Sequence, residues 1–75
     1  MNGSKAAAQF KQATRDRLLE ARRNGLGAAK LAELSEGALS SEQILTILEG
    51  RKQPIEIYRE LAAALDRWTP PETTT

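Results

Sequence analysis

One short segment with both ends well defined constrains this chain most: residues 39–54, LSSEQILTILEGRKQP. Ser40 is a favoured N-cap, and Gln43, three residues later, can return the hydrogen bond to complete a capping box. Apolar residues at helical spacing follow, and Gly50 ends the helix because glycine readily adopts the left-handed conformation required there. The segment therefore predicts a rigid helix over about 41–49, with one buried stripe and one polar outer face.

Three further helices are predicted around this one. The first has its N-cap at Ser4 and runs to about Arg23, and the second runs from Ala28 to about Ser35. The last places Pro54 at its first position and has the most regular apolar period of the chain. No segment alternates apolar and polar residues as a strand does, so the fold class is predicted to be all-α, a small bundle of four to five helices.

The apolar positions of these helices predict one small core. The first helix is expected to turn Phe10, Thr14, Leu18 and Ala21 inward, and Leu26 is expected to return to the core after it. The residues predicted to join across all four helices are Leu18, Leu31, Leu34, Ile44, Ile47, Ile57, Leu61 and Leu65. This core organises residues 1–69 as a single domain, and residues 70–75, PPETTT, are predicted to be a disordered tail.

Composition limits the chemistry that the chain can perform. Its 75 residues include no cysteine and no histidine, so the commonest metal ligands and general base are missing. Glu56 and Glu60 share a helical face, but such pairs are usually solvated charges, and a chain this short has little room for an enclosed pocket. We therefore expect no enzyme activity and no cofactor. With no apolar run long enough for a membrane span or a signal peptide, we expect a cytoplasmic protein without a membrane partner.

Charge is distributed unevenly along the chain. Residues 1–30 carry seven Lys and Arg against two carboxylates, a balance of +5, whereas residues 31–75 carry four against eight, a balance of −4. At about 100° per residue, Lys11, Arg15 and Arg22 lie on one face of the first predicted helix. Two interpretations are open: this face meets phosphates, or it is a solvated surface balanced by neighbouring carboxylates.

A series of motifs runs through the second half of the chain, LAELSEGALSSEQILTILEGRKQPIEIYRELAAALD. They are Leu31-Ala32, Leu39-Ser40, Ile44 with Ile47, Gly50-Arg51-Lys52-Gln53-Pro54, and Leu61-Ala62 with Leu65. In this order the motifs resemble the lambda-repressor, Cro and Xre family of helix-turn-helix domains, over about residues 15–66. Three departures are visible: the turn between the second and third helices is about two residues longer, Ala28 stands where the family often has a phosphate-binding Gln, and Ala21 and Leu48 stand where the family has an ion pair.

The resemblance implies a duplex DNA-binding regulator of transcription, of the repressor type, that acts as a possible homodimer on a two-fold site. By family position, Ser41, Glu42 and Thr46 would face base edges, with Gln43 at the margin. Lys30, Arg51 and Lys52 would contact phosphates.

A second interpretation of the same scaffold remains open. Between Leu31 and Gly50 there is no Lys or Arg, but there are four carboxylates: Glu33, Glu36, Glu42 and Glu49. Carboxylates near a phosphate backbone oppose binding. The alternative function is therefore a helical protein-interaction module that docks a basic partner through the acidic face of the helix at 41–49.

Overall fold

A computed structural model describes residues 2–69 of the chain and the side chains of residues 5–69. This part contains four helices, α1 (Asn2–Arg23), α2 (Ala28–Leu34), α3 (Ser41–Leu48) and α4 (Ile55–Arg67), and no strand. The predicted all-α class is therefore confirmed. The predicted disordered tail, residues 70–75, lies outside the described residues.

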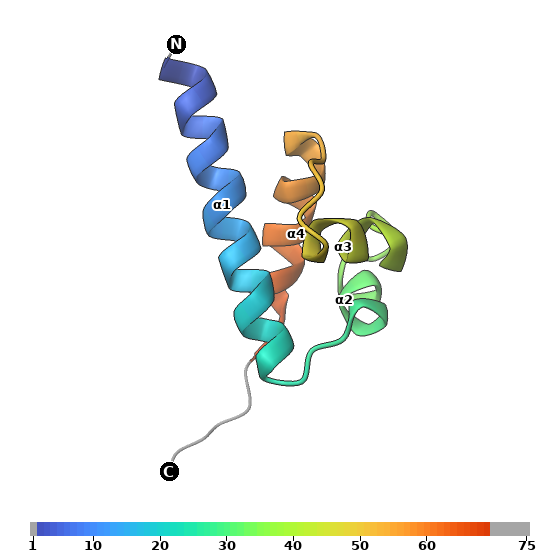
Figure 1. Cartoon of the computed structure of the whole chain (residues 1–75). Coiled ribbons are helices and arrows are strands. Elements are labelled where there is room, and N and C mark those ends of the chain that lie inside the picture. The colour runs from blue at the N-terminus through green and yellow to red at the C-terminus, as the bar shows by residue number, and fades with distance from the viewer. Residues whose placement is uncertain (1, 70–75) are drawn as a thin grey trace.

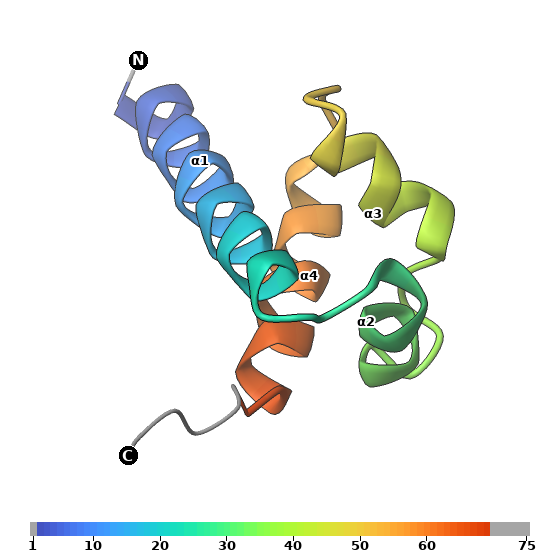
Figure 2. The same cartoon turned by 60° about the horizontal axis from the view of Figure 1, so that its bottom comes forward.

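The two longer helices form the frame of the fold. In Figures 1 and 2, α4 runs beside α1, and the short helices α2 and α3 lie together on the other side of α4. The contacts follow this arrangement: α1 packs on α4, α2 packs on both α3 and α4, and α3 also touches α1. Because α1 has 22 residues, its first turns extend past the other helices (Figure 1).

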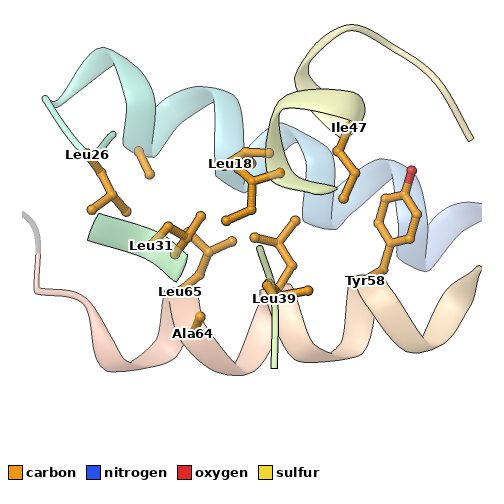
Figure 3. Packing of buried hydrophobic residues seen from close by; sticks show 11 residues of the cluster. Leu18, Leu26, Leu31, Leu39, Ile47, Tyr58, Ala64 and Leu65 are labelled. Atoms are coloured by element: carbon orange, nitrogen blue, oxygen red, sulfur yellow. The ribbon is translucent and has the colours of Figure 1, made fainter. Parts of the chain in front are cut away.

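One core joins all four helices (Figure 3). Its buried apolar residues are Leu18, Ala21, Leu26, Leu31, Leu39, Ile44, Ile47, Tyr58, Leu61, Ala64 and Leu65. Of the residues predicted to form it, Leu34 and Ile57 are only half-buried and pack against its edge. The return of Leu26 to the core is confirmed, and Tyr58 extends from α4 toward α1 (Figure 3).

The prediction for Phe10 is wrong, because its side chain is 37% exposed. Phe10 lies beside the N-terminal part of α4, in a surface hollow whose other lining residues are Ala6, Ala7, Ile55 and Arg59. Thr14, one turn later, is buried and donates its hydroxyl to the carbonyl of Phe10 at 2.8 Å. The core therefore begins one turn later along α1 than the apolar spacing predicted.

Helix α3 has the ends that its sequence predicted. The Ser40 hydroxyl accepts from the Gln43 N–H at 3.1 Å, and the Gln43 side-chain oxygen accepts from the Ser40 N–H at 2.9 Å. At the other end Gly50 has φ 89°, and the N–H of Arg51 donates to the carbonyl of Thr46 at 3.1 Å. This left-handed termination aims the chain from α3 toward α4.

Two other predicted helix starts differ from the structure. Helix α1 begins at Asn2, before the predicted N-cap Ser4, because the alanine-rich sequence that follows has high helix propensity and nothing in it stops the helix from extending backward. Pro54 is the N-cap of α4 and not its first helical residue, with extended backbone at ψ 154°.

The turn between α2 and α3 is built on Ser35, a buried residue. Its hydroxyl donates to the carbonyl of Ala32 at 2.6 Å and accepts from the N–H of Leu39 at 3.0 Å. Between these anchors the chain reverses through two left-handed residues, Glu36 at φ 59° and Gly37 at φ 90°. Ser35 thus fixes the position of Leu39, the residue just before the α3 N-cap.

Arginines from the long helices hold the C-termini of both short helices. Arg15 of α1 donates Nε to the carbonyl of Ile47 at 2.9 Å and Nη2 to the carbonyl of Leu48 at 3.2 Å. Arg67 of α4 donates Nη1 to the carbonyl of Leu34 at 2.6 Å. These carbonyls carry the partial negative charge of a helix end, so a guanidinium stabilises them by charge as well as by hydrogen bonding.

Candidate nucleic-acid interface

The outward face of α3 combines acidic and apolar side chains. Ile44 and Ile47 are fully buried, which turns Glu42, Leu45 and Glu49 to the opposite side of the helix, where all three are exposed. Leu45 is 44% exposed, the most of any large apolar residue in the described chain. This acidic face of α3, defined by these three residues, is the surface that α3 presents to a partner.

Two of the three other polar residues predicted at this face, Thr46 and Gln43, are engaged in local hydrogen bonds. Thr46 is half-buried, and its hydroxyl donates to the carbonyl of Glu42 at 2.8 Å. Gln43 uses its side-chain oxygen in the capping box, so the structure gives this residue a role in helix stability. Ser41 is half-buried at the first position of α3.

Beside the C-terminal end of α3 lies a cleft that gathers basic residues from three segments. Helix α1, the turn between α3 and α4, and α4 border this open cleft, which has a volume of about 470 Å³. Its lining residues are Ala7, Ala8, Lys11, Gln12, Arg15, Gly50, Arg51, Lys52 and Tyr58. We call this the basic cleft, because four of these side chains are cationic and none is a carboxylate.

The cations of the basic cleft are held by packing and hydrogen bonds. Lys11 places its Nζ 5.5 Å from the centre of the buried Tyr58 ring, within the range of a cation–π contact. The guanidinium of Arg15 is fixed by the α3 carbonyls and lies beside Gly50, where a Cβ would be 3.8 Å from Nη2. Arg51 is exposed and approaches the Glu49 carboxylate to 3.6 Å.

Lys52 completes the cleft on the solvent side and is exposed. Within residues 5–69, no carboxylate oxygen lies within 4.0 Å of the charged nitrogens of Lys11, Arg15 or Lys52. Three of the four cations are therefore free of acidic partners in the described structure, and only Arg51 shares its charge with a carboxylate. Exposed pairs such as Arg51 with Glu49 contribute little energy, so they are easily exchanged for another anion.

The structure brings together only part of the predicted site. Arg51 and Lys52 meet in the basic cleft, whereas Lys30 lies on α2, outside it, with Nζ 3.9 Å from the Glu33 carboxylate. Lys11 and Arg15 join the cleft, although the sequence interpretation did not place them in the site. The sequence did indicate that Lys11 and Arg15 share one face of α1. The same pattern also placed Arg22 on that face, and Arg22 does not line the cleft.

Ala21 and Leu48, the two apolar residues noted in the sequence comparison of motifs, belong to the core or its edge. Ala21 is buried, and Leu48 is half-buried and packs against the same cluster. Arg15 approaches the backbone of Leu48 from elsewhere on α1, six residues before Ala21. The end of α3 is therefore bound by an arginine of α1 through backbone carbonyl oxygens.

Two other kinds of site have no support in the described residues. Residues 2–69 contain no helix with both the length and the apolar character needed to cross a membrane. Over the same residues there is no cluster of three or more acidic side chains arranged to hold a metal ion.

Comparison with protein-family models, with curated proteins and with solved structures found no match for this chain. Two charged surfaces of the chain lie at α3 or beside its C-terminal end: the basic cleft and the acidic face of α3.

Proposed function

We propose that this protein binds duplex DNA through a repressor-like helix-turn-helix formed by α2, the turn at 35–40 and α3, and that it regulates transcription. In this arrangement α2 supports α3, and the outward face of α3 enters the major groove. The packing of α2 on α3 and the exposure of the outward side of α3 support the proposal. A homodimer on a two-fold site is part of the proposal, and sedimentation or size-exclusion measurements with and without duplex test it.

The basic cleft is the observation that carries the proposal. It includes Arg51 and Lys52, which directly follow the end of α3, so a duplex that meets the outward face of α3 is within reach of these two cations. Phosphate contacts of this kind supply most of the non-specific affinity and fix the orientation of a protein on DNA. Lys30, in the first turn of α2 and outside the cleft, adds a further phosphate contact in this proposal.

The acidic face of α3 gives this interface an unusual electrostatic character. Glu42 and Glu49 repel the backbone on either side of the groove, whereas a Glu that reaches a base edge can accept from the amino group of cytosine. Binding is then weak on random sequence and gains most where Glu42 meets a cytosine. Thr46 contributes through its methyl group, because its hydroxyl is engaged with the Glu42 carbonyl.

Fluorescence anisotropy with a labelled random duplex, at low and moderate salt, tests the proposal. Arg51→Ala and Lys52→Ala should weaken binding to all sequences and lower the salt slope by about 0.9 for each phosphate that the variant no longer neutralises. Arg22→Ala makes the same charge change outside the cleft and should leave the slope unchanged. A wild-type protein that binds no duplex at low salt, where the phosphate term is strongest, would exclude the proposal.

Two substitutions on α3 test separately whether this helix recognises the base sequence of the DNA. Thr46→Ala should change which sequence is preferred while leaving affinity for random duplex nearly constant. Glu42→Gln should raise affinity for random duplex, because it removes a repulsive charge, and should reduce the preference for cytosine. Selection of bound sequences from a random library measures both effects.

A second candidate function rests on Leu45. This side chain is exposed between Glu42 and Glu49 on one helical face, so a basic amphipathic helix can bury it while its cations pair with the two carboxylates. Under this alternative, Glu42→Gln weakens binding to a protein and has no effect on DNA. Pull-down with a basic amphipathic peptide, compared between wild type and Glu42→Gln, distinguishes the two functions.

A further inference from the structure

The cations of the basic cleft concentrate more charge than one DNA phosphate can neutralise. A phosphodiester brings a single negative charge, and its neighbours along the strand follow the duplex axis away from any one point. The cleft, in contrast, is lined by four cationic side chains around about 470 Å³, with Gly50 leaving space where a side chain would stand. Such a site is better matched to a small anion that carries several charges on adjacent groups.

Two other hollows of the surface lack this character. One, of about 550 Å³ between α1 and α4, is lined by three carboxylates with Arg17 as its single cation. The other, beside Phe10, is mainly apolar and has Arg59 as its single charged residue. The concentration of cations in the basic cleft is therefore a specific feature, and it does not follow from the net charge of the chain, which is only +1.

Part of the cleft is also organised before any ligand binds. Arg15 is fixed through two hydrogen bonds to α3, and Lys11 is held over the Tyr58 ring. The conformational entropy of these two side chains is already lost when the protein folds. Binding of an anion at this site therefore costs less conformational entropy. Lys52 and Arg51 at the rim are exposed and can close on the ligand from the solvent side.

We propose that the basic cleft binds a diphosphate group, either free pyrophosphate or the diphosphate of a nucleotide. Gln12 adds an amide that can donate to the ligand, and the backbone at Gly50 permits close approach. Resting on the DNA-binding function proposed above, the inference adds a form of regulation: the diphosphate competes with the DNA backbone for Arg51 and Lys52, so its binding releases the duplex.

Titration calorimetry of the full chain with sodium pyrophosphate at low ionic strength tests the site directly. Pyrophosphate should bind with one-to-one stoichiometry and more tightly than inorganic phosphate. The same titration is repeated with a nucleoside diphosphate. An affinity equal to that of pyrophosphate identifies the diphosphate alone as the recognised group, and a higher affinity identifies a nucleotide as the ligand. Binding that is absent, or no tighter than that of inorganic phosphate, overturns the proposal.

Charge-matched variants separate a built site from general attraction. Lys11→Gln and Lys52→Gln should each weaken pyrophosphate binding by about tenfold, whereas Lys5→Gln, on α1 but outside the cleft, should leave it unchanged. An equal loss in all three variants would show an adventitious ion only. Lys52 is exposed, so Lys52→Gln keeps the test valid if Lys11→Gln disturbs the packing on Tyr58.

Competition with DNA separates this inference from the function on which it rests. Addition of pyrophosphate to a labelled duplex complex should lower the anisotropy of the wild type, and Lys52→Gln should need about tenfold more pyrophosphate for the same release. If pyrophosphate binds but no duplex does, the site stands and the proposed function fails. If duplex binds and pyrophosphate does not, the proposed function stands and this inference fails.

Discussion

Arg15 donates its Nε to the carbonyl oxygen of Ile47 at 2.9 Å, joining α1 to the last turn of α3. The same guanidinium donates to the carbonyl of Leu48, which has no partner within its own helix because it lies in the last turn. One side chain therefore closes the end of α3 and at the same time lines the basic cleft. The orientation of α3 and the charge of the cleft depend on the same residue.

Arg15→Gln should destabilise the fold. Loss of two charge-assisted hydrogen bonds at a half-buried site predicts a decrease of about 1.5–3 kcal/mol in the free energy of unfolding. Arg15→Lys keeps the charge near the helix end but not the forked geometry, so it should recover only part of this loss. Urea denaturation followed by circular dichroism measures all three proteins. Arg22→Gln, exposed on the same helix, should change stability by less than about 0.5 kcal/mol.

Ser35→Ala should also destabilise the protein, although it removes only one oxygen. The buried N–H of Leu39 loses its acceptor, which costs about 1–3 kcal/mol. Ser40→Ala removes an exposed N-cap instead and should cost about 1 kcal/mol. Thermal melting distinguishes them, because 1 kcal/mol corresponds to about 4–8 °C in a domain of this size. A Ser35→Ala protein with unchanged Tm would show that the turn is not held by this hydroxyl.

Glu36→Gly should stabilise the protein. Glu36 has φ 59°, a conformation that is unfavourable for a residue with a Cβ. Glycine removes this strain, and the gain is larger than the stability lost because glycine makes the unfolded chain more flexible. We expect a net gain of about 0.5–1 kcal/mol. The ion pair with Arg67 that disappears with the carboxylate, at 4.0 Å and exposed, contributes little. Glu33→Gly, in the helical part of α2, should instead destabilise by about 1 kcal/mol.

The features that sequence alone predicted are those decided by neighbouring residues. The capping box of Ser40 with Gln43 and the left-handed Gly50 involve hydrogen bonds that span five residues or fewer, so local chemistry determines them. The helices and most of the core followed from periodicity for the same reason. The predicted burial of Phe10 was wrong because burial depends on where the partner helix begins, and the periodicity of α1 carries no information about the position of α4.

The basic cleft could be predicted only in part. Arg51 and Lys52 are adjacent in sequence, but Arg15 reaches α3 across 32 residues, and only the packing of α1 selects it over Arg22. The role of Ser35 was missed for another reason. Its hydroxyl bridges the end of one helix and the start of the next, and this bridge depends on the two left-handed residues between them, of which Glu36 has no sequence signal for that conformation.

Leu45→Lys distinguishes the two functions of the α3 face most sharply. Leu45 is 44% exposed, so the substitution should leave the fold intact, which circular dichroism checks. If α3 enters the major groove, a cation between Glu42 and Glu49 should tighten binding to random duplex. The slope of log affinity against log salt should steepen by about 0.9, because one further phosphate charge is neutralised.

If the acidic face of α3 docks a protein, the same change removes the apolar anchor and abolishes that interaction. Ala13→Lys adds the same charge on the side of α1 away from the basic cleft and should do neither. Equal tightening of DNA binding in both variants would mean that only net charge matters, and that α3 is not the surface that meets the duplex.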